Sequence, residues 1–158
     1  MSLALIPGSF DPMTLGHLDL VKRALALYDE VVVAVMINDQ KQYAHSLEER
    51  AKTAELTLDG LERARVVTSE GLLVDLFDEL GADVIVKGIR NEQDREYEKK
   101  MAEWNLEHNP RAKTVFLQAA DDFDRISSSA VRERMARGED LCGLVTPSVA
   151  TYLKTLKH

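Results

Sequence analysis

The chain has 158 residues and a mass of 17.7 kDa, a size typical of one domain. Its 45% hydrophobic and 30% charged residues are an ordinary globular mixture, and its single cysteine, Cys142, excludes an intramolecular disulfide and a cysteine-rich zinc site. The formal net charge of -7 argues against a non-specific nucleic-acid binder, and no apolar run approaches the roughly 20 residues of a membrane span. We therefore expect a cytoplasmic protein that binds neither nucleic acid nor membrane. A pocket for a small anion can still be basic in a chain that is acidic overall.

Four elements are predicted in the first third of the chain. Continuous apolar residues at 3–6 predict a strand, and apolar residues at helical spacing predict a helix over 16–27. Seven consecutive apolar residues, mostly β-branched, predict a strand at 31–37 that is covered on both faces, as in a parallel sheet. Ser46-Leu47-Glu48-Glu49 forms a capping box, which predicts a helix that reaches about Leu58.

The same alternation of strand and helix continues along the chain. Strands are predicted at 65–67, 84–86 and 114–117, and helices at 72–80, 92–108, 128–137 and 149–156. Because parallel neighbours need crossover helices, this order predicts a Rossmann-like α/β fold, a doubly wound sheet of five parallel strands with helices on both faces. We expect a single domain over 1–158, with C-terminal helices at about 138–158 packed on it.

Some chemically distinctive residues receive no functional assignment. His45, His108 and His158 lack partners at ligand spacing and are predicted to be surface residues. Cys142 has no nearby base in the sequence and is predicted to be a buried small hydrophobic residue. Trp104 is expected either in the core or at a subunit interface.

The loop after the first strand is the first candidate site. In open α/β sheets, ligands bind beyond the carboxyl ends of the strands, near the point where the strand order reverses. The loop at 7–17 contains Gly8 and Gly16 and leads into a helix N-terminus, whose N–H groups suit phosphate. His17 lies in the first turn of that helix, where its imidazole can donate to a phosphoryl oxygen as negative charge develops. A lone histidine can also pack or cap locally, but its position beside this loop favours a catalytic role.

Two later segments occupy similar positions. Lys87-Gly88-Ile89-Arg90 directly follows the strand at 84–86, so two cations flank a glycine; they either bind anions or are solvated surface charges. Ser127, Ser128 and Ser129 stand at a helix start, where hydroxyl and N–H groups make an anion cradle. Ordinary N-capping is the alternative, although it needs only one serine.

Together the three loops resemble a known superfamily. Pro-Gly-Ser-Phe-Asp-Pro at 7–12, Thr-Leu-Gly-His at 14–17 and Ile-Ser-Ser-Ser at 126–129 are similar to the nucleotidyltransferases with HxGH and ISSTxxR signatures. Within that superfamily the chain resembles the bacterial phosphopantetheine adenylyltransferase family, from the first strand to about residue 132 without an evident insertion. The agreement includes Leu47-Glu48-Glu49-Arg50, Lys87-Gly88-Ile89-Arg90 and Glu96-Tyr97-Glu98. An ordered set of motifs at family-like spacing is far more specific than one motif.

The resemblance implies the penultimate step of coenzyme A biosynthesis. ATP and 4'-phosphopantetheine would give dephospho-coenzyme A (dephospho-CoA) and pyrophosphate, reversibly and with Mg²⁺, by direct attack of the pantetheine phosphate on the α-phosphorus. Nothing in the sequence requires a protein nucleophile, which agrees with catalysis by positioning and charge stabilisation. The resemblance places Mg²⁺ on the ATP phosphates. Asp121, Asp122 and Asp124 are interpreted as part of a solvated loop, and no metal ligand is assigned to the chain.

The resemblance also implies a role for individual residues. His17 is expected to stabilise the transition state at the α-phosphate. The expected nucleotide contacts are Ser9, Phe10, His17, Gly88, Ile89, Arg90, Glu98, Phe123, Asp124, Arg125, Ile126, Ser127, Ser128 and Ser129. The expected acceptor contacts are Ser9, Lys41, Lys87 and Leu73, the last lining the pantetheine arm.

The chain departs from the family pattern at a few positions. Thr14 replaces the first histidine of the superfamily motif, a change that also occurs within the family. Ser9 and Ser129 stand where threonine is frequent, and both keep a hydroxyl. Lys87 stands where an arginine is expected, which keeps the charge but removes the bidentate fork available to the acceptor phosphate.

Two other functions remain compatible with these residues. A sister nucleotidyltransferase with another acceptor, such as nicotinate mononucleotide or glycerol phosphate, would share the nucleotide residues and differ at Lys41, Leu73 and Lys87. A nucleotide-binding regulatory module would keep the pocket without turnover, although binding alone does not require His17. The resemblance further implies a homohexamer, as a dimer of trimers, and inhibition by coenzyme A.

Overall fold

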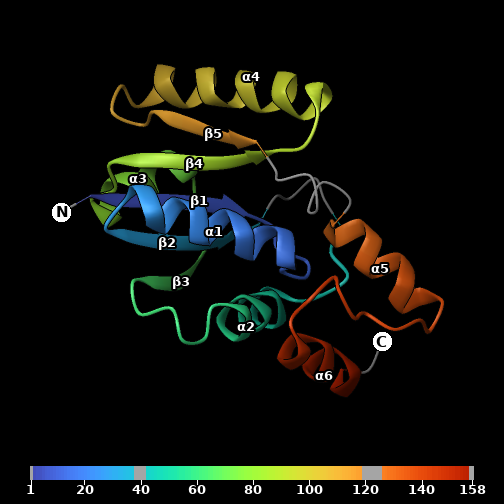
Figure 1. The fold of residues 1–158 in the computed structure, drawn as a ribbon. Helices are drawn as coiled ribbons and strands as arrows, with labels where there is room; N and C mark the ends of the chain where they lie inside the picture. The colour runs from blue at the N-terminus through green and yellow to red at the C-terminus, as the bar shows by residue number, and fades with distance from the viewer. Residues whose placement is uncertain (1, 38–41, 119–125, 157–158) are drawn as a thin grey trace.

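A five-stranded parallel sheet lies at the centre of the computed structural model, which describes residues 2–37, 42–118 and 126–156 (Figure 1). The strands are β1 (Leu3–Gly8), β2 (Glu30–Met36), β3 (Ala64–Ser69), β4 (Val84–Ile89) and β5 (Thr114–Gln118). The helices are α1 (Leu15–Leu27), α2 (Leu47–Thr57), α3 (Leu73–Leu80), α4 (Glu92–His108), α5 (Ser128–Ala136) and α6 (Pro147–Thr155). Every predicted element is present in the predicted order.

The strand order is β3-β2-β1-β4-β5, and all neighbouring strands are parallel. β1 is central, with Ile6 beside Val33 of β2 and Leu5 beside Ile85 of β4. The chain adds β2 and β3 on one side of β1 and then places β4 and β5 on the other. The order therefore reverses between β1 and β4, and the predicted doubly wound sheet is confirmed.

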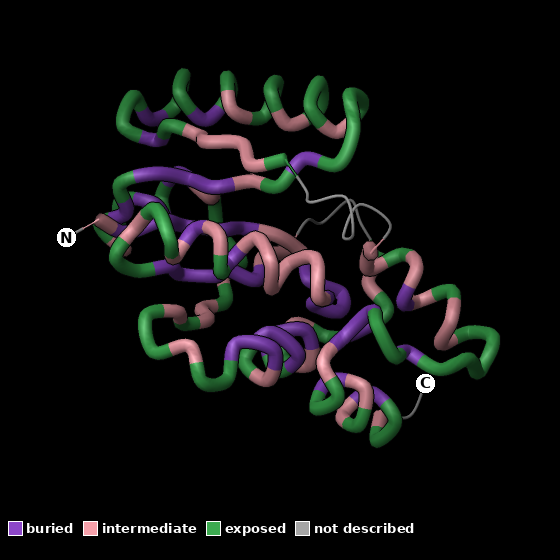
Figure 2. The backbone as a smooth tube through the Cα atoms, in the orientation of Figure 1, coloured by how far each residue is buried: buried purple, intermediate pink, exposed green. Residues whose placement is uncertain are grey.

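Helices cover both faces of this sheet. α1 and α2 pack on the face that carries Ile6 and Val33, whereas α3 packs on the opposite face against Leu5 and Ile85. Because successive side chains of a strand point to opposite faces, the continuous apolar runs of β1 and β2 are buried on both sides (Figure 2). The two-faced covering predicted from residues 31–37 is confirmed.

Local capping explains the helix boundaries. The predicted capping box of α2 is present, because the Ser46 hydroxyl accepts from the Glu49 N–H and the Glu49 carboxylate accepts from the Ser46 N–H. Gly81 ends α3 at a φ of 66°, a left-handed conformation that favours glycine. α6 begins earlier than predicted, because Pro147 suits a first helical turn capped by Thr146. In the described segments, no helix has both the length and the apolar character needed to cross a membrane.

The last two helices share a small core of their own. Val131 of α5 and Leu153 of α6 meet the buried Leu141 and Leu144 of their connection, and Leu56 of α2 packs against them. Figure 1 shows that α5 lies beyond the carboxyl ends of the strands. The cluster thus holds the N-terminal end of α5 near the loops that follow β1 and β4.

Two predictions about single residues are wrong. His45 is buried, with 4% of its surface exposed, because it packs beside the carboxylate of Asp11 rather than facing water. Cys142 is exposed, because the turn between α5 and α6 directs Leu141 and Leu144 inward instead. Among the other residues set aside, His108 is exposed as expected, and His158 lies outside the described residues.

Trp104 is not in the core of the chain. It is 38% exposed on α4 and stacks on His108, with ring centroids 3.7 Å apart. Of the two expectations for this residue, the core position is therefore wrong.

Candidate active site

A cleft of about 370 Å³ opens at the carboxyl ends of β1 and β4, where the strand order reverses. This is the position at which ligands bind in open α/β sheets. Its walls come mainly from the loop after β1, the first turns of α1, the end of β4 and the N-terminal turn of α5. The lining residues are Ile6, Pro7, Gly8, Ser9, Phe10, Asp11, Gly16, His17, Asp19, Leu20, Arg23, Val86, Lys87, Gly88, Ile89, Arg90, Asp94, Glu98, Leu117, Ile126, Ser127, Ser128, Ser129 and Arg132.

The fold brings most of the predicted site residues into this one cleft. The predicted nucleotide contacts that line it are Ser9, Phe10, His17, Gly88, Ile89, Arg90, Glu98, Ile126, Ser127, Ser128 and Ser129. Phe123, Asp124 and Arg125 lie outside the described residues. Three segments that are distant in sequence, at 7–17, 87–90 and 126–129, therefore converge on a shared space.

Only some of the predicted acceptor contacts line the same cleft. Ser9 and Lys87 line the cleft, and Lys41 lies outside the described residues. Leu73 does not line this cleft. It is the first residue of α3 and packs against the core on the face of the sheet that α3 covers. Its role at the pantetheine arm stays a prediction.

The backbone cap of α1 orients the imidazole of His17. Thr14 is the N-cap residue, and its N–H donates to Nδ1 of His17 at 3.0 Å. Nδ1 must be unprotonated to accept this bond, so the neutral ring carries its proton on Nε2. The opposite ring nitrogen, Nε2, is then an N–H donor on the side of the ring away from the cap, available to the cleft that His17 lines.

Burial and two cations keep this imidazole neutral. Burial, followed by the charges of Arg90 and Lys87, lowers the pKa of His17 from 6.5 to about 4. At neutral pH the group is therefore a hydrogen-bond donor and not a source of a transferable proton. Such a donor can stabilise the negative charge that develops on a phosphoryl oxygen.

Phe10 supports the same ring from its side. The two rings meet edge to face, with centroids 4.9 Å apart and an interplanar angle of 79°. Phe10 has a φ of 49°, a left-handed conformation that is uncommon for a residue with a side chain. Gly8 leaves room for the Phe10 ring, because a Cβ at residue 8 would stand 2.9 Å from Cζ of Phe10.

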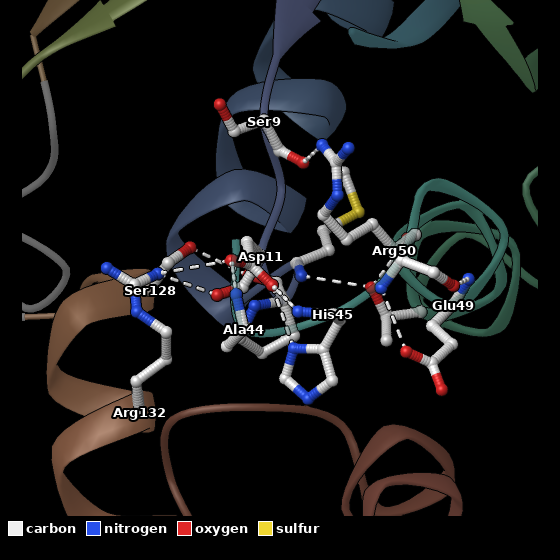
Figure 3. A network of polar contacts seen from close by, with 12 residues as sticks. Ser9, Asp11, Ala44, His45, Glu49, Arg50, Ser128 and Arg132 are labelled. Atoms are coloured by element: carbon white, nitrogen blue, oxygen red, sulfur yellow. Dashed lines mark hydrogen bonds and ion pairs between the residues drawn. The ribbon is translucent and has the colours of Figure 1, made fainter. Parts of the chain in front are cut away.

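The loop from Ser9 to Thr14, called here the anchored loop, is held by side chains from several elements (Figure 3). From α2, Arg50 donates to the Ser9 carbonyl at 2.9 Å, and the Thr53 hydroxyl accepts from the Met13 N–H at 3.1 Å. From α5, Ser128 donates to the Pro12 carbonyl at 2.7 Å, and Arg132 donates to the Asp11 carbonyl at 2.7 Å.

The carboxylate of Asp11 provides a further anchor. It accepts from the N–H groups of Ala44 and His45 and from Nδ1 of His45, the last at 2.8 Å. Burial raises the pKa of Asp11, but the bonds from His45 and Ala44 and the charge of Arg132 outweigh it, so the pKa lies below its ordinary value. Asp11 is thus an ionised acceptor at neutral pH.

The opposite wall of the cleft is formed by side-chain ion pairs. Lys87 Nζ lies 3.5 Å from a carboxylate oxygen of Glu98, and Arg90 Nε lies 3.2 Å from one of Asp94. These side chains are partly exposed, and their partners can be exchanged for anions of a ligand. Asp94 is a lining residue that the sequence interpretation did not include.

The three serines at the start of α5 have different partners. Ser127 caps the helix by accepting from the Ala130 N–H, Ser128 bonds the anchored loop, and Ser129 accepts from Arg132. Capping is therefore the role of Ser127 alone. The Ser128 hydroxyl joins α5 to the anchored loop, whereas the Ser129 hydroxyl bonds Arg132 one turn further along the same helix.

Several cleft residues were missed from the sequence. On α1, Asp19, Leu20 and Arg23 follow Gly16 at spacings of three, four and seven, so one helix face lines the cleft. That helical spacing from Gly16 could have predicted that these residues face the cleft. Arg132 was visible as the last residue of its motif but was given no role.

No group of three or more candidate metal ligands occurs in the described residues. The acidic side chains at the cleft are engaged instead, with Asp94 and Glu98 in ion pairs and Asp11 bonded to His45. The described part of the chain thus does not fit a resident Mg²⁺ site made of carboxylates. Asp121, Asp122 and Asp124 lie outside the described residues.

Comparison with known proteins first defines the class. The cytidylyltransferase-like family model matches residues 5–134. A solved structure of a putative nicotinate-nucleotide adenylyltransferase from Vibrio parahaemolyticus is similar with a TM-score of 0.72, at 20% identity, over 98% of this chain and 93% of that one. At that identity the likeness shows a shared fold alone. The family match assigns the chain to the cytidylyltransferase-like family.

Curated relatives define the particular family. The phosphopantetheine adenylyltransferase of Rubrobacter xylanophilus is 47% identical over 99% of this chain and 95% of its own length. That of Thermotoga neapolitana is 45% identical over 96% and 94%, and that of Limosilactobacillus reuteri (strain DSM 20016) is 40% identical over 98% and 89%. The chain belongs to the phosphopantetheine adenylyltransferase family, and the resemblance drawn from its three loops is confirmed.

Proposed function

We propose that this protein transfers the adenylyl group of ATP to 4'-phosphopantetheine, forming dephospho-CoA and pyrophosphate reversibly in coenzyme A biosynthesis. A phosphate oxygen of the acceptor forms a bond to the α-phosphorus of ATP, and the bond from that phosphorus to the pyrophosphate oxygen breaks. The observation that carries the proposal is His17, which lines the cleft with Lys87 and Arg90 and whose Nδ1 accepts from the Thr14 N–H, so that Nε2–H is left as a donor.

His17 is the proposed catalytic residue. Its Nε2–H donates to an oxygen of the α-phosphate, and the bond strengthens as charge accumulates there in the transition state. No covalent intermediate is needed, because both reactants bind in one cleft and the acceptor phosphate is itself the nucleophile. The anchored loop keeps this donor in place, so little reorganisation accompanies the reaction.

Both walls of the cleft contribute to each reactant. Ser9, Phe10, Gly88, Ile89 and Arg90 contact ATP, with Ser127–Ser129 and the N-terminal end of α5 at its phosphates. Ser9 and Lys87 bind the acceptor phosphate. Glu98, proposed from the family at the nucleotide, is paired with Lys87 at 3.5 Å, so a phosphate at Lys87 replaces this partner.

Mg²⁺ enters this scheme as part of the nucleotide substrate. The described carboxylates at the cleft are already bonded, and a magnesium ion prefers phosphate and water oxygens to a dedicated protein cage. MgATP is therefore the proposed reactant.

The association of copies is proposed from α4. Tyr97, Met101 and Trp104 follow each other at helical spacing and are 61%, 43% and 38% exposed. An apolar stripe of this kind is typical of an interface, and it is consistent with the homohexamer expected from the family. Inhibition by coenzyme A, which shares most of its structure with the product, would act at the same cleft.

Turnover tests the proposal directly. Purified protein is incubated with ATP, Mg²⁺ and 4'-phosphopantetheine, and dephospho-CoA is followed by mass while pyrophosphate is followed by a coupled assay. Equal amounts of both products are expected. Turnover only with nicotinate mononucleotide or glycerol phosphate would identify a sister nucleotidyltransferase, and ATP binding without turnover on any acceptor would identify a regulatory module.

A further inference from the structure

His45 is buried in a segment whose neighbours are exposed. Residues 42–46 lead directly into α2, and both Ala44 and Ser46 face solvent. The side chain of His45 turns inward instead and is only 1% exposed, with Nδ1 at 2.8 Å from Oδ1 of Asp11 (Figure 3). An ionised carboxylate only accepts hydrogen bonds, so Nδ1 of His45 carries the proton and donates.

Asp11 lies between this histidine and the start of α5. Its carbonyl accepts from Arg132, and the carbonyl of the next residue, Pro12, accepts from Ser128. The carboxylate side of Asp11 is held by residues 44 and 45, and the carbonyl side by α5. Asp11 is thus fixed from two directions. Ala44 and His45, which hold its carboxylate, do not line the cleft described above.

The residue directly before Asp11 is Phe10, which supports the imidazole of His17. Phe10 has a φ of 49°, a conformation that a residue with a side chain keeps only where its surroundings hold it. The bonds at Asp11 restrain the chain immediately after this residue. The Phe10 ring then meets His17 edge to face at 4.9 Å.

We propose that His45 is a positioning residue for adenylyl transfer: its bond to Asp11 holds Phe10 in its left-handed conformation and thereby holds the imidazole of His17 at the cleft. The inference rests on the proposed function. His45 acts through Asp11 and touches neither reactant.

Two amide variants test whether the N–H group that His45 donates to Asp11 must lie at the position of Nδ1. In H45N the side-chain N–H lies close to the place of Nδ1, so the bond to Asp11 is kept; in H45Q it lies near the place of Nε2, so the bond is lost. H45F keeps an aromatic ring without any donor. We expect kcat about tenfold lower in H45Q and H45F, KM for ATP within about twofold of the wild type, and recovery of most of the kcat in H45N.

The role through His17 is tested by combining variants. Because the effect of His45 is transmitted to His17, H45Q should change kcat by less than about twofold in the H17A background. Each variant is assayed well below its own Tm, and its ATP-binding stoichiometry, measured by calorimetry, gives the folded fraction. If H45F fails to fold, the pair H45N and H45Q still decides the question.

Three results would overturn the role of His45. They are a kcat in H45Q equal to that of the wild type, an equal loss in H45N and H45Q, and a tenfold loss that persists in the H17A background. Failure of the proposed function is distinguished by the wild type itself. A wild type that makes no dephospho-CoA overturns both, whereas a working wild type with an unaffected H45Q overturns only the positioning role.

Discussion

The loops after β1 and β4 face each other across one cleft, but they are held in contrasting ways. The anchored loop from Ser9 to Thr14 is fixed by Arg50, Thr53, Ser128 and Arg132, and three of the four bonds are made to backbone carbonyls. At the end of β4, Lys87 and Arg90 are held by carboxylates at 3.5 and 3.2 Å, and all four side chains are partly exposed.

This difference matches two requirements of the proposed reaction. A donor that acts in the transition state must already be in place, and several buried or part-buried bonds to the backbone keep it there. A group that binds an incoming phosphate must exchange one anion for another, and an exposed ion pair contributes little and is screened by salt. The anchored loop is therefore suited to catalysis, and the end of β4 to binding.

Removal of the donor from the anchored loop should have the largest effect. In H17A we expect kcat to fall about 10²- to 10³-fold, the range found when one transition-state donor is lost, with KM for ATP within about threefold. H17Q keeps an amide N–H near the position of Nε2 and should recover part of the kcat. Steady-state kinetics with each substrate varied measure both constants. Equal losses in kcat and in ATP affinity would mean that His17 binds ATP without acting in the transition state.

Displacement of the donor without its removal should have an intermediate effect. A Cβ in G8A would stand 2.9 Å from Cζ of Phe10, so the ring must shift and carry His17 with it. We expect kcat to fall about tenfold, since small misplacements of a catalytic group are costly.

G71A is the matched control for this change. The closest atom to a Cβ at residue 71 is Oγ of Ser69 at 3.9 Å, which is ordinary contact, and this glycine does not line the cleft. Its kcat should equal that of the wild type. A G8A enzyme with wild-type kcat would show that the position of Phe10 does not limit the reaction.

Changes at the end of β4 should act on binding. In K87M we expect KM for the acceptor to rise about tenfold and kcat to change less, because a charge-assisted bond to the phosphate is lost. K87R restores the charge and supplies the bidentate fork, so its acceptor KM should be at or below that of the wild type. The wild-type KM should also rise with salt more steeply than that of K87M. An unchanged acceptor KM in K87M would place the acceptor phosphate elsewhere.

The sequence predicts much of this arrangement because its signals are local. The apolar run of β2 spans residues 31–36 and identifies a strand covered on both faces. The polar helix α4 has the predicted bounds, 92–108, with Asn91 as its cap. Alternation of such elements leads to a parallel sheet, and the site then follows from the rule that ligands bind where the strand order reverses.

The anchors of the loop after β1 have no local signal. His45 and Asp11 are 34 residues apart, and Arg132 and Asp11 are 121 apart, so no periodicity relates them. The burial of His45 and the exposure of Cys142 depend on these long-range contacts and on an irregular turn. Both were predicted wrongly for that reason, whereas the predicted residues of segments 7–17, 87–90 and 126–129 that line the cleft were found from their motifs.

The smallest expected effect connects the two loops through charge. After burial, Arg90 and Lys87 lower the pKa of His17 to about 4, so the unfolded chain, with a pKa near 6.5, binds a proton before the folded one does. The free energy of unfolding should therefore fall between pH 6.5 and about 4 through this group, while above pH 6.5 the group makes no difference.

H17Q does not titrate and should lose less stability over the same window, as urea unfolding of both proteins at several pH values will measure. In K87M the pKa of His17 should rise, so its stability should change less than that of the wild type over this window. A difference between the wild type and H17Q that stays constant with pH would mean that His17 titrates normally, and the neutral donor of the anchored loop would then not be maintained by the cations of the opposite wall.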